Sequence, residues 1–286
     1  MVAREPAVRR LIVSADDVGL SAGITEGALR ALRDGIVTSL SVMTAVDDWA
    51  GTARRLHAAG VEDVGVHLSL CEGRSVLPGS RVRSLADAEG RFPTSLSTVV
   101  RRLATGRVRR SELRAEWGAQ IRRARDSGFR VSHVDGHKHV HVMPGLVSVI
   151  RAVLEDSGVR GIRLPREPGA GPRRRVRGAL MLASSRAAGF ARAPDRVVGV
   201  AQAGGLHEDG LVGLLKQLPE GTSELVSHPG RPGPELPDAM LAAGLVWGAS
   251  YAFGAELAAL TSARVRAEVE AQGVELLSWE DFLAGG

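Results

Sequence analysis

Residues 11–34 read LIVSADDVGLSAGITEGALRALRD, and this stretch sets a pattern that the rest of the chain repeats. It opens with a short apolar run of the kind that forms strands, which stops at two aspartates. From residue 22 the apolar residues recur at intervals of three and four, the period of a helix with one buried face. The stretch predicts a strand over 11–15, an acidic strand end and a helix over 22–34.

The same order of strand and helix recurs along the 286 residues. Strand-type runs follow at 38–44, 64–70, 130–135, 161–164, 196–201, 224–228 and 274–279, with helical patterns between them, such as 111–127. Such alternation favours a mainly parallel sheet with right-handed crossovers. Seven or eight units in one chain, with no obvious linker, predict an α/β fold with the sheet closed into a barrel, regular or distorted. A doubly wound open sheet is the alternative. Loops are expected at 72–95 and 167–175.

The composition is that of a soluble globular protein, with 44% hydrophobic and 24% charged residues. The single cysteine, Cys71, cannot form an internal disulfide, so nothing requires an oxidising compartment. We find no apolar run long enough for a signal peptide or a membrane span. The expected location is cytoplasmic.

The net charge of +5 comes almost wholly from arginine, with a dense cluster at 172–177. Only 3% of the residues are aromatic, so a stacking platform for bases is missing and we expect no nucleic-acid partner. The favoured interpretation of the cluster is a solvated basic face. The alternative is that 178–191 forms an amphipathic helix in peripheral contact with a membrane, which we rank below an ordinary barrel helix.

Polar residues fall in or just after the strand-type runs. These residues are Asp16, Asp17, His67, Asp135, His137, Arg163 and His228. In parallel α/β folds the carboxyl ends of the strands and the loops after them form one rim, where active sites gather. We therefore expect these side chains to converge on a single site.

Two adjacent carboxylates, Asp16 and Asp17, are costly at a strand end unless a cation compensates them. One of them could simply cap the next helix. Two adjacent aspartates favour a functional site. Alternation along the strand would point their side chains in different directions. That suits one metal ligand and one general base.

The run 133–141, HVDGHKHVH, holds four of the eight histidines in the chain. Neutral imidazole is a common ligand of Zn²⁺ and similar ions, so this density beside acidic residues predicts a metal site. We favour His137 as a ligand because the preceding glycine leaves room for it. His141 is either a second ligand or a residue that orients one, and Asp135 is suited to orienting an imidazole. His133 is expected to pack inside its strand. His228, followed by Pro-Gly, is a candidate general acid.

These segments together resemble the YdjC-like carbohydrate deacetylases, which include the ChbG and HpnK deacetylases. The resemblance lies in residues 12–21, 65–68, 133–141, 162–165 and 227–230. Residues 218–221 and 256–260 are most similar to the hopanoid-associated HpnK branch. The resemblance runs over about residues 10–283 and implies a distorted TIM-like (β/α) barrel, as a single domain covering 1–286. It also implies one divalent metal ion, Mg²⁺ or Zn²⁺, with Asp17, His67 and His137 as ligands and Asp16 as the base. Val18 and Lys138 depart from the usual family pattern.

The expected function is therefore metal-dependent removal of an N-acetyl group from an amino sugar, either free or lipid-linked. Asp16 would activate water, and His228 would protonate the leaving nitrogen. Arg163 is expected either to contact a substrate hydroxyl or carboxylate at the rim or to be a structural ion-pair partner. His139 is assigned to substrate contact or ligand support. A metal-dependent sugar isomerase or lyase is the alternative, using Lys138 or Glu167 as a proton shuttle. A non-enzymatic, arginine-rich protein that binds anionic surfaces around a structural metal is a third hypothesis, and a homodimer is left open.

Overall fold

A computed structural model describes residues 8–165, 191–231, 248 and 250–285. The arginine cluster at 172–177, the expected loop at 167–175 and Glu167 lie outside the described residues, as does nearly all of the expected helix at 178–191. The described part forms one α/β domain built on a curled parallel sheet.

All the strand-type runs of the sequence form strands. The strands are β1 (Arg9–Val18), β2 (Ser39–Val42), β3 (Asp63–Leu68), β4 (Arg130–Gly136), β5 (Gly161–Ile162), β6 (Arg196–Val198), β7 (Gly221–Ser227) and β8 (Val274–Leu277). Their order is β5-β4-β3-β2-β1-β7-β6, and β8 pairs with β1. The long strand β1 pairs with β7 on one side, and with β8 and then β2 on the other. Every pairing is parallel, as predicted.

In the described residues the sheet is less closed than the barrel that the sequence predicted. β5 and β6, at the two ends of the strand order, are not paired with each other as strands. An isolated bridge joins Gly161 to Arg192, with hydrogen bonds from Ile162 N to Arg192 O and from Arg192 N to Arg160 O. The described chain is therefore a curled, partly closed sheet, and a full TIM barrel is not confirmed.

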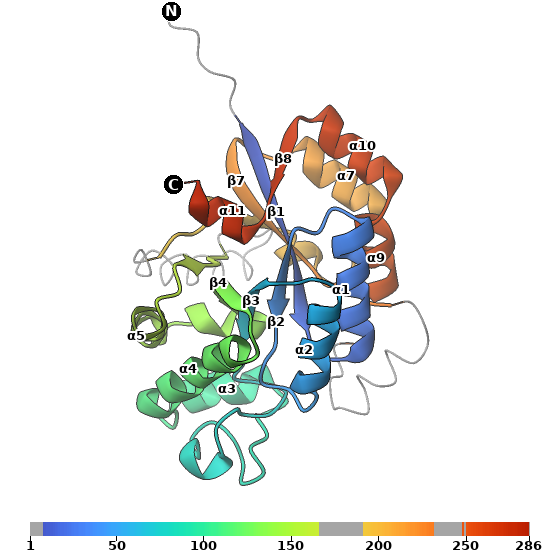
Figure 1. Ribbon diagram of the computed structural model, residues 1–286. Coiled ribbons are helices and arrows are strands. Elements are labelled where there is room, and N and C mark those ends of the chain that lie inside the picture. The colour runs from blue at the N-terminus through green and yellow to red at the C-terminus, as the bar shows by residue number, and fades with distance from the viewer. Residues whose placement is uncertain (1–7, 166–190, 232–247, 249, 286) are drawn as a thin grey trace, which may run out of the picture.

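Helices cover the outside of this sheet. They are α1 (Ala22–Asp34), α2 (Trp49–Ala58), α3 (Leu96–Ala104), α4 (Arg110–Asp126), α5 (Val147–Ser157), α7 (Glu208–Lys216), α9 (Phe253–Leu260), α10 (Ala263–Ala271) and α11 (Trp279–Ala284), with short 3₁₀ segments at Gly79–Arg81, His137–Val142 and Val200–Gln202. In Figure 1, α1, α2 and α9 lie along one side, and α4 and α5 lie along the other. Within the described part, no helix has the length and apolar character needed to span a membrane.

The turn from β1 into α1 is set by local hydrogen bonds. Ser21 caps α1, and its hydroxyl accepts a hydrogen bond from Ile24 N. The buried Thr25 hydroxyl accepts from Gly19 N at 3.1 Å and donates to the Ser21 carbonyl at 2.9 Å. Gly19 has φ of +101°, which a side chain would strain. These bonds fix the chain immediately after the two aspartates.

The expected loop at 72–95 is ordered by two carboxylates of α4. Glu116 accepts hydrogen bonds from Val76 N and Leu77 N at 2.8 and 3.0 Å, and Glu112 accepts from Ser84 N at 2.8 Å. Figure 1 shows this loop in teal beside α3 and α4, past the arrowheads of the central strands. The loop therefore lies over the rim where the sequence places the site.

Candidate metal centre

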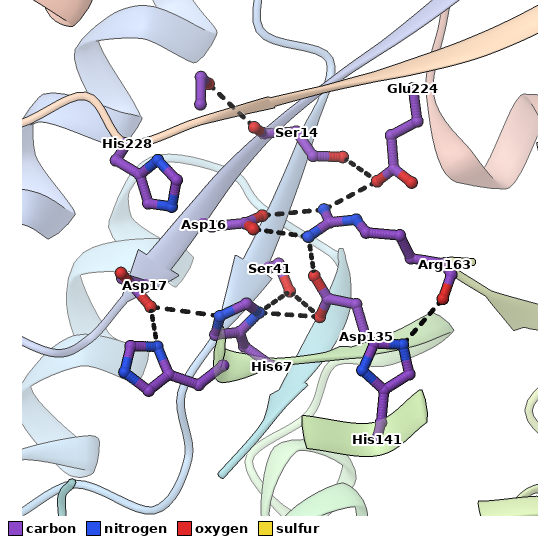
Figure 2. Close-up of polar contacts among 12 residues, drawn as sticks. Ser14, Asp16, Asp17, Ser41, His67, Asp135, His141, Arg163, Glu224 and His228 are labelled. Carbon is purple, nitrogen blue, oxygen red and sulfur yellow. Dashed lines mark hydrogen bonds and ion pairs between the residues drawn. The ribbon is translucent and has the colours of Figure 1, made fainter. Parts of the chain in front are cut away.

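A β-bulge brings the two aspartates into one site. Ala15 and Val18 of β1 are opposite Leu40 and Val42 of β2, so two residues of β1 face a single residue of β2. Asp17 also has φ of +58°, in the left-handed region. Strict alternation would send the two carboxylates to opposite faces of the sheet. The bulge instead leaves both buried among the same polar side chains (Figure 2).

Asp17, His67 and His137 form a buried cluster whose ligand atoms all lie within 4.8 Å of one another. The Asp17 Oδ1 atom is 3.2 Å from His67 Nε2 and 2.8 Å from His137 Nδ1. His67 comes from β3, and His137 follows the end of β4. These are the three residues that the resemblance implied as ligands, brought together from distant parts of the chain.

The far side of the His67 ring is held by Asp135. Asp135 is the neighbour of His67 in the pairing of β3 with β4, and its Oδ1 lies 3.0 Å from His67 Nδ1. The Ser41 hydroxyl of β2 donates to the same Oδ1 at 2.5 Å. With Nδ1 facing Asp135, the His67 ring presents Nε2 to Asp17. Asp135 therefore lies where an imidazole-orienting residue was expected.

Arg163 is fully buried and joins the acidic side chains of the site. Its two terminal nitrogens contact the two carboxylate oxygens of Asp16 at 2.5 and 2.9 Å (Figure 2). It also pairs with Asp135 through Nη1 and with Glu224 of β7 through Nη2, the latter at 2.8 Å. Such a bidentate contact between a guanidinium and a carboxylate fixes the orientation of the carboxylate and pairs its charge. Arg163 is thus a partner of Asp16, one of the two roles considered for it.

Glu224 extends this network toward the opposite end of the sheet. Its Oε1 accepts hydrogen bonds from the Ser14 hydroxyl at 2.7 Å and from Trp279 Nε1 at 3.0 Å, besides the Arg163 contact. Burial raises the pKa of Glu224, although Arg163 acts in the opposite direction. The interior is therefore a continuous polar network that leads from α11 to Asp16.

His228 directly follows β7 and is buried, with a side chain that is 10% exposed. Its backbone N–H donates to Glu256 of α9 at 2.6 Å, and its Nδ1 is 3.9 Å from the same carboxylate. Glu256 also accepts from Gly204 N at 2.7 Å. The Tyr251 ring meets the His228 ring edge-on, at 5.3 Å between centroids. In Figure 2 His228 lies on the same side of the site as Asp16 and Asp17.

The other histidines of the run 133–141 are not members of the three-residue cluster. The His141 ring, through Nε2, donates to the Arg163 carbonyl at 2.8 Å, and burial lowers the pKa of His141 to about 4. Burial, together with His141 and Arg163, lowers the pKa of His139 well below its usual value. His133 stacks on Trp279 at 4.2 Å between centroids, inside the strand as expected. His141 thus contacts the backbone of Arg163, and the two roles considered for it, a second ligand or a residue that orients one, stay predictions.

The pKa values in the cluster follow from opposite charges facing each other. Burial would raise the pKa of Asp17, yet the facing His137 and His67 hold it well below its usual value. Burial likewise disfavours a charged His67, but Asp135 and Asp16 raise the pKa of His67 well above its usual value. The protein on its own therefore stabilises these buried groups as ion pairs, and a cation among them would compete with protons.

The cluster fits a divalent cation by the chemistry of its donors. One carboxylate and two imidazoles form a three-ligand set that leaves a further coordination position open. Each imidazole has a carboxylate on its other nitrogen, Asp135 for His67 and Glu72 for His137. A second group of donors, Asp16, His67 and Asp135, is also within reach. There, however, both carboxylates are already paired with Arg163.

Sequence reasoning missed several residues of the site: Ser14, Ser41, Glu72, Glu224 and Glu256. Glu224 carried a signal, because a carboxylate inside an otherwise apolar strand needs a buried partner. The two serines carried none, since serine is ordinary in strands. Glu72 lay in a segment treated as loop, and Glu256 was noted only as part of the resemblance.

Comparisons with known proteins show the family of this chain. The family model described as YdjC-like protein matches residues 10–271, and the chain belongs to this family. A carbohydrate deacetylase of Mus musculus is 34% identical, covering 96% of this chain and 94% of its own. A carbohydrate deacetylase of Geobacillus stearothermophilus is 30% identical, covering 96% and 98%. A crystal structure from Enterococcus faecalis V583 shares the fold, with a TM-score of 0.78, 23% identity and coverage of 96% and 99%.

Proposed function

We propose that this protein is a metal-dependent carbohydrate N-deacetylase, which hydrolyses the acetamide of an amino sugar. The observation that carries the proposal is the buried Asp17, His67 and His137 cluster beside an aspartate, Asp16, held by Arg163. Relatives that match nearly the whole chain are named carbohydrate deacetylases. We assign the metal to Asp17, His67 and His137, the base to Asp16 and the acid to His228.

The reaction requires a nucleophile, stabilisation of an oxyanion and protonation of a poor leaving group. A divalent ion in the cluster would polarise the acetyl carbonyl and lower the pKa of the attacking water. The Asp16 carboxylate would accept a proton from that water, while the Arg163 fork holds the carboxylate in place. The C–N bond then breaks as His228 gives a proton to the departing amine. Acetate and a free amino sugar result.

The isomerase or lyase alternative has less support. It requires a lysine or glutamate that can move a proton at the substrate carbon. Lys138 Nζ is paired with the buried Glu72, so the amine that would have to move this proton is already engaged. Glu167 lies outside the described residues.

The sugar substrate is a finer part of the proposal. The resemblance of residues 218–221 and 256–260 to the hopanoid-associated branch suggests an N-acetylated amino sugar attached to a lipid. Lys138, which departs from the chitooligosaccharide pattern, agrees with that suggestion. Peripheral membrane contact and a homodimer remain predictions, as does a cytoplasmic location.

Acetate release tests the proposal directly. The purified protein, loaded with Zn²⁺ or Mg²⁺, is incubated with N-acetylglucosamine, its short oligomers and an N-acetylglucosaminyl lipid in vesicles. We expect acetate from at least one of them and almost none from the Asp16→Asn protein. Absence of acetate with every substrate and both metals would contradict the proposed activity. Preference for the lipid-linked substrate, with binding to anionic vesicles that weakens as salt is raised, would support the finer proposal.

A further inference from the structure

Glu72, just beyond the end of β3, is a buried carboxylate with no role in the mechanism above. Its side chain contacts two consecutive residues of the segment that follows β4. The Oε2 atom is 2.7 Å from His137 Nε2, and Oε1 is paired with Lys138 Nζ. Both carboxylate oxygens are thus engaged directly behind a proposed metal ligand.

The orientation of the His137 ring makes this contact significant. His137 Nδ1 faces Asp17 Oδ1 at 2.8 Å, and the same oxygen lies 3.2 Å from His67 Nε2. Nδ1 is therefore the nitrogen directed into the donor cluster, and Nε2 points away from it. An imidazole that ligates through one nitrogen carries its proton on the other. In His137 that proton would lie on Nε2, where Glu72 can accept it.

His67 has the same arrangement, with the roles of its two ring nitrogens exchanged. Its Nε2 faces Asp17, and its Nδ1 faces Asp135, which is in turn paired with Arg163. Each imidazole thus has its own carboxylate, and each carboxylate is paired with a cation, Arg163 for Asp135 and Lys138 for Glu72. A carboxylate behind a ligating histidine selects the tautomer, fixes the ring and strengthens the ligand.

The backbone supports Glu72 at the expense of local strain. In the described chain, four non-glycine residues have positive φ, and all four belong to this region: Asp17, Glu72, Lys138 and His139. Such conformations are strained and persist only where the surroundings enforce them. Glu72 N donates to the Pro93 carbonyl at 2.9 Å, and a side chain at Gly73 would clash with the Ala45 carbonyl. The loop therefore holds the carboxylate in a defined place.

We propose that Glu72 is a positioning residue for His137. It holds the Nε2–H tautomer, so that Nδ1 is available to the metal, and Lys138 holds the carboxylate. The inference rests on the proposed metal site but not on the identity of the substrate.

Metal affinity tests this inference without any substrate. We would compare wild type, Glu72→Ala and Glu72→Gln by competition for Zn²⁺ with a chromophoric chelator. Loss of a residue that orients a ligand typically weakens binding 10- to 100-fold. We expect a loss of that size for Glu72→Ala and a smaller loss for Glu72→Gln, which keeps an acceptor oxygen but no charge.

Glu116→Gln is the matched control. Glu116 is another buried carboxylate that binds the same loop, through Val76 N and Leu77 N, and it makes no contact with His137. Its substitution should leave Zn²⁺ affinity near that of wild type. An equal loss in Glu116→Gln and Glu72→Gln would show that loop placement alone matters. Wild-type affinity in Glu72→Ala would show that the Glu72 side chain does not position His137. Either result overturns the proposal.

The protonation of His137 gives a second measurement. In the Zn²⁺-loaded protein, long-range ¹H–¹⁵N correlation should show His137 protonated at Nε2, and protonation at Nδ1 would overturn the inference. Because neither measurement uses a sugar, failure of acetate release would remove the proposed activity and leave this test intact.

Discussion

At the scale of single residues, the site separates side chains that would bind a metal from one that would move a proton. Asp16 and Asp17 are adjacent in sequence but have different partners. Asp17 faces two imidazoles, whereas both oxygens of Asp16 face Arg163. This division of contacts supports different roles for two residues of the same type.

Substitution of Asp16 should separate chemistry from metal binding. Asp16→Asn keeps the shape of the side chain but removes its basicity, so kcat should fall by roughly 10²–10⁴-fold. Zn²⁺ affinity should change little, as measured by competition with a chelator. If metal is lost and activity returns when Zn²⁺ is added in excess, Asp16 is a ligand and the assignment of the base is wrong.

Two histidines four residues apart should differ sharply in their effect on metal. His137→Ala removes a proposed ligand and should lower the metal content of the purified protein, determined by elemental analysis. His141→Ala serves as its control, because His141 contacts the Arg163 carbonyl and is absent from the donor cluster. Full stoichiometry and affinity in His137→Ala would show that the ligand set is incorrect.

At the scale of elements, the bulge in β1 and the turn into α1 place Asp17. The Thr25 hydroxyl stabilises this turn, because it accepts a hydrogen bond from Gly19 N and donates one to the Ser21 carbonyl. The site depends on an irregular strand that a neighbouring helix holds in place.

Removal of this hydroxyl should affect both stability and metal binding. Thr25→Val is nearly isosteric but leaves the buried Gly19 N–H without a partner, at a cost of roughly 1–3 kcal/mol. We expect a lower free energy of unfolding in urea and weaker Zn²⁺ binding, since Asp17 loses its support. Thr261→Val, whose hydroxyl bonds only to carbonyls of its own helix, should change neither quantity noticeably. Equal effects of the two substitutions would contradict the role of the turn.

At the scale of the whole molecule, α11 connects distant segments through Trp279. This fully buried residue donates from its backbone N–H to the Ser39 hydroxyl at 2.9 Å and from Nε1 to Glu224 at 3.0 Å. Its ring stacks on His133. The carboxyl-terminal helix therefore completes the interior that leads to the site.

His133 should make this interior sensitive to acid. Burial lowers the pKa of His133 to about 3, from an ordinary value of 6.5. Between these two values the unfolded chain binds a proton that the folded protein does not, so stability falls as the pH drops from about 6.5 toward 3. The free energy of unfolding falls by up to about 1.4 kcal/mol per pH unit where His133 is protonated in the unfolded chain and neutral in the folded protein.

A pH series of urea denaturation on metal-free protein measures this effect. His133→Asn should lower stability at pH 7.5, because the stacking is lost, but should show a shallower decline toward pH 4. The comparison with wild type is needed because Asp63 changes the stability in the opposite direction as the pH falls. Burial raises the pKa of Asp63 to about 6, so its contribution is present below its unfolded value of 3.8 and is lost as the pH rises through 6. Parallel declines in the two proteins would contradict the assignment to His133.

Much of the fold could be read from local patterns. Strands and helices have their own periods, so the eight strand-type runs and the helix at 22–34 were predictable. Parallel strands end at a common rim, which is why Asp17, His67 and His137 could be placed together before any contact was known. The resemblance of spaced motifs then narrowed their roles.

Tertiary structure alone decided the contacts that complete the site. Glu72 meets His137 across 65 positions of sequence, and Arg163 meets Asp16 across 147. The bulge that turns both aspartates inward depends on pairing with β2, and the partial closure depends on where Arg192 meets β5. Local patterns specify which face of an element is buried. They do not specify strand register or loop path, and these two determine which buried carboxylate meets which cation.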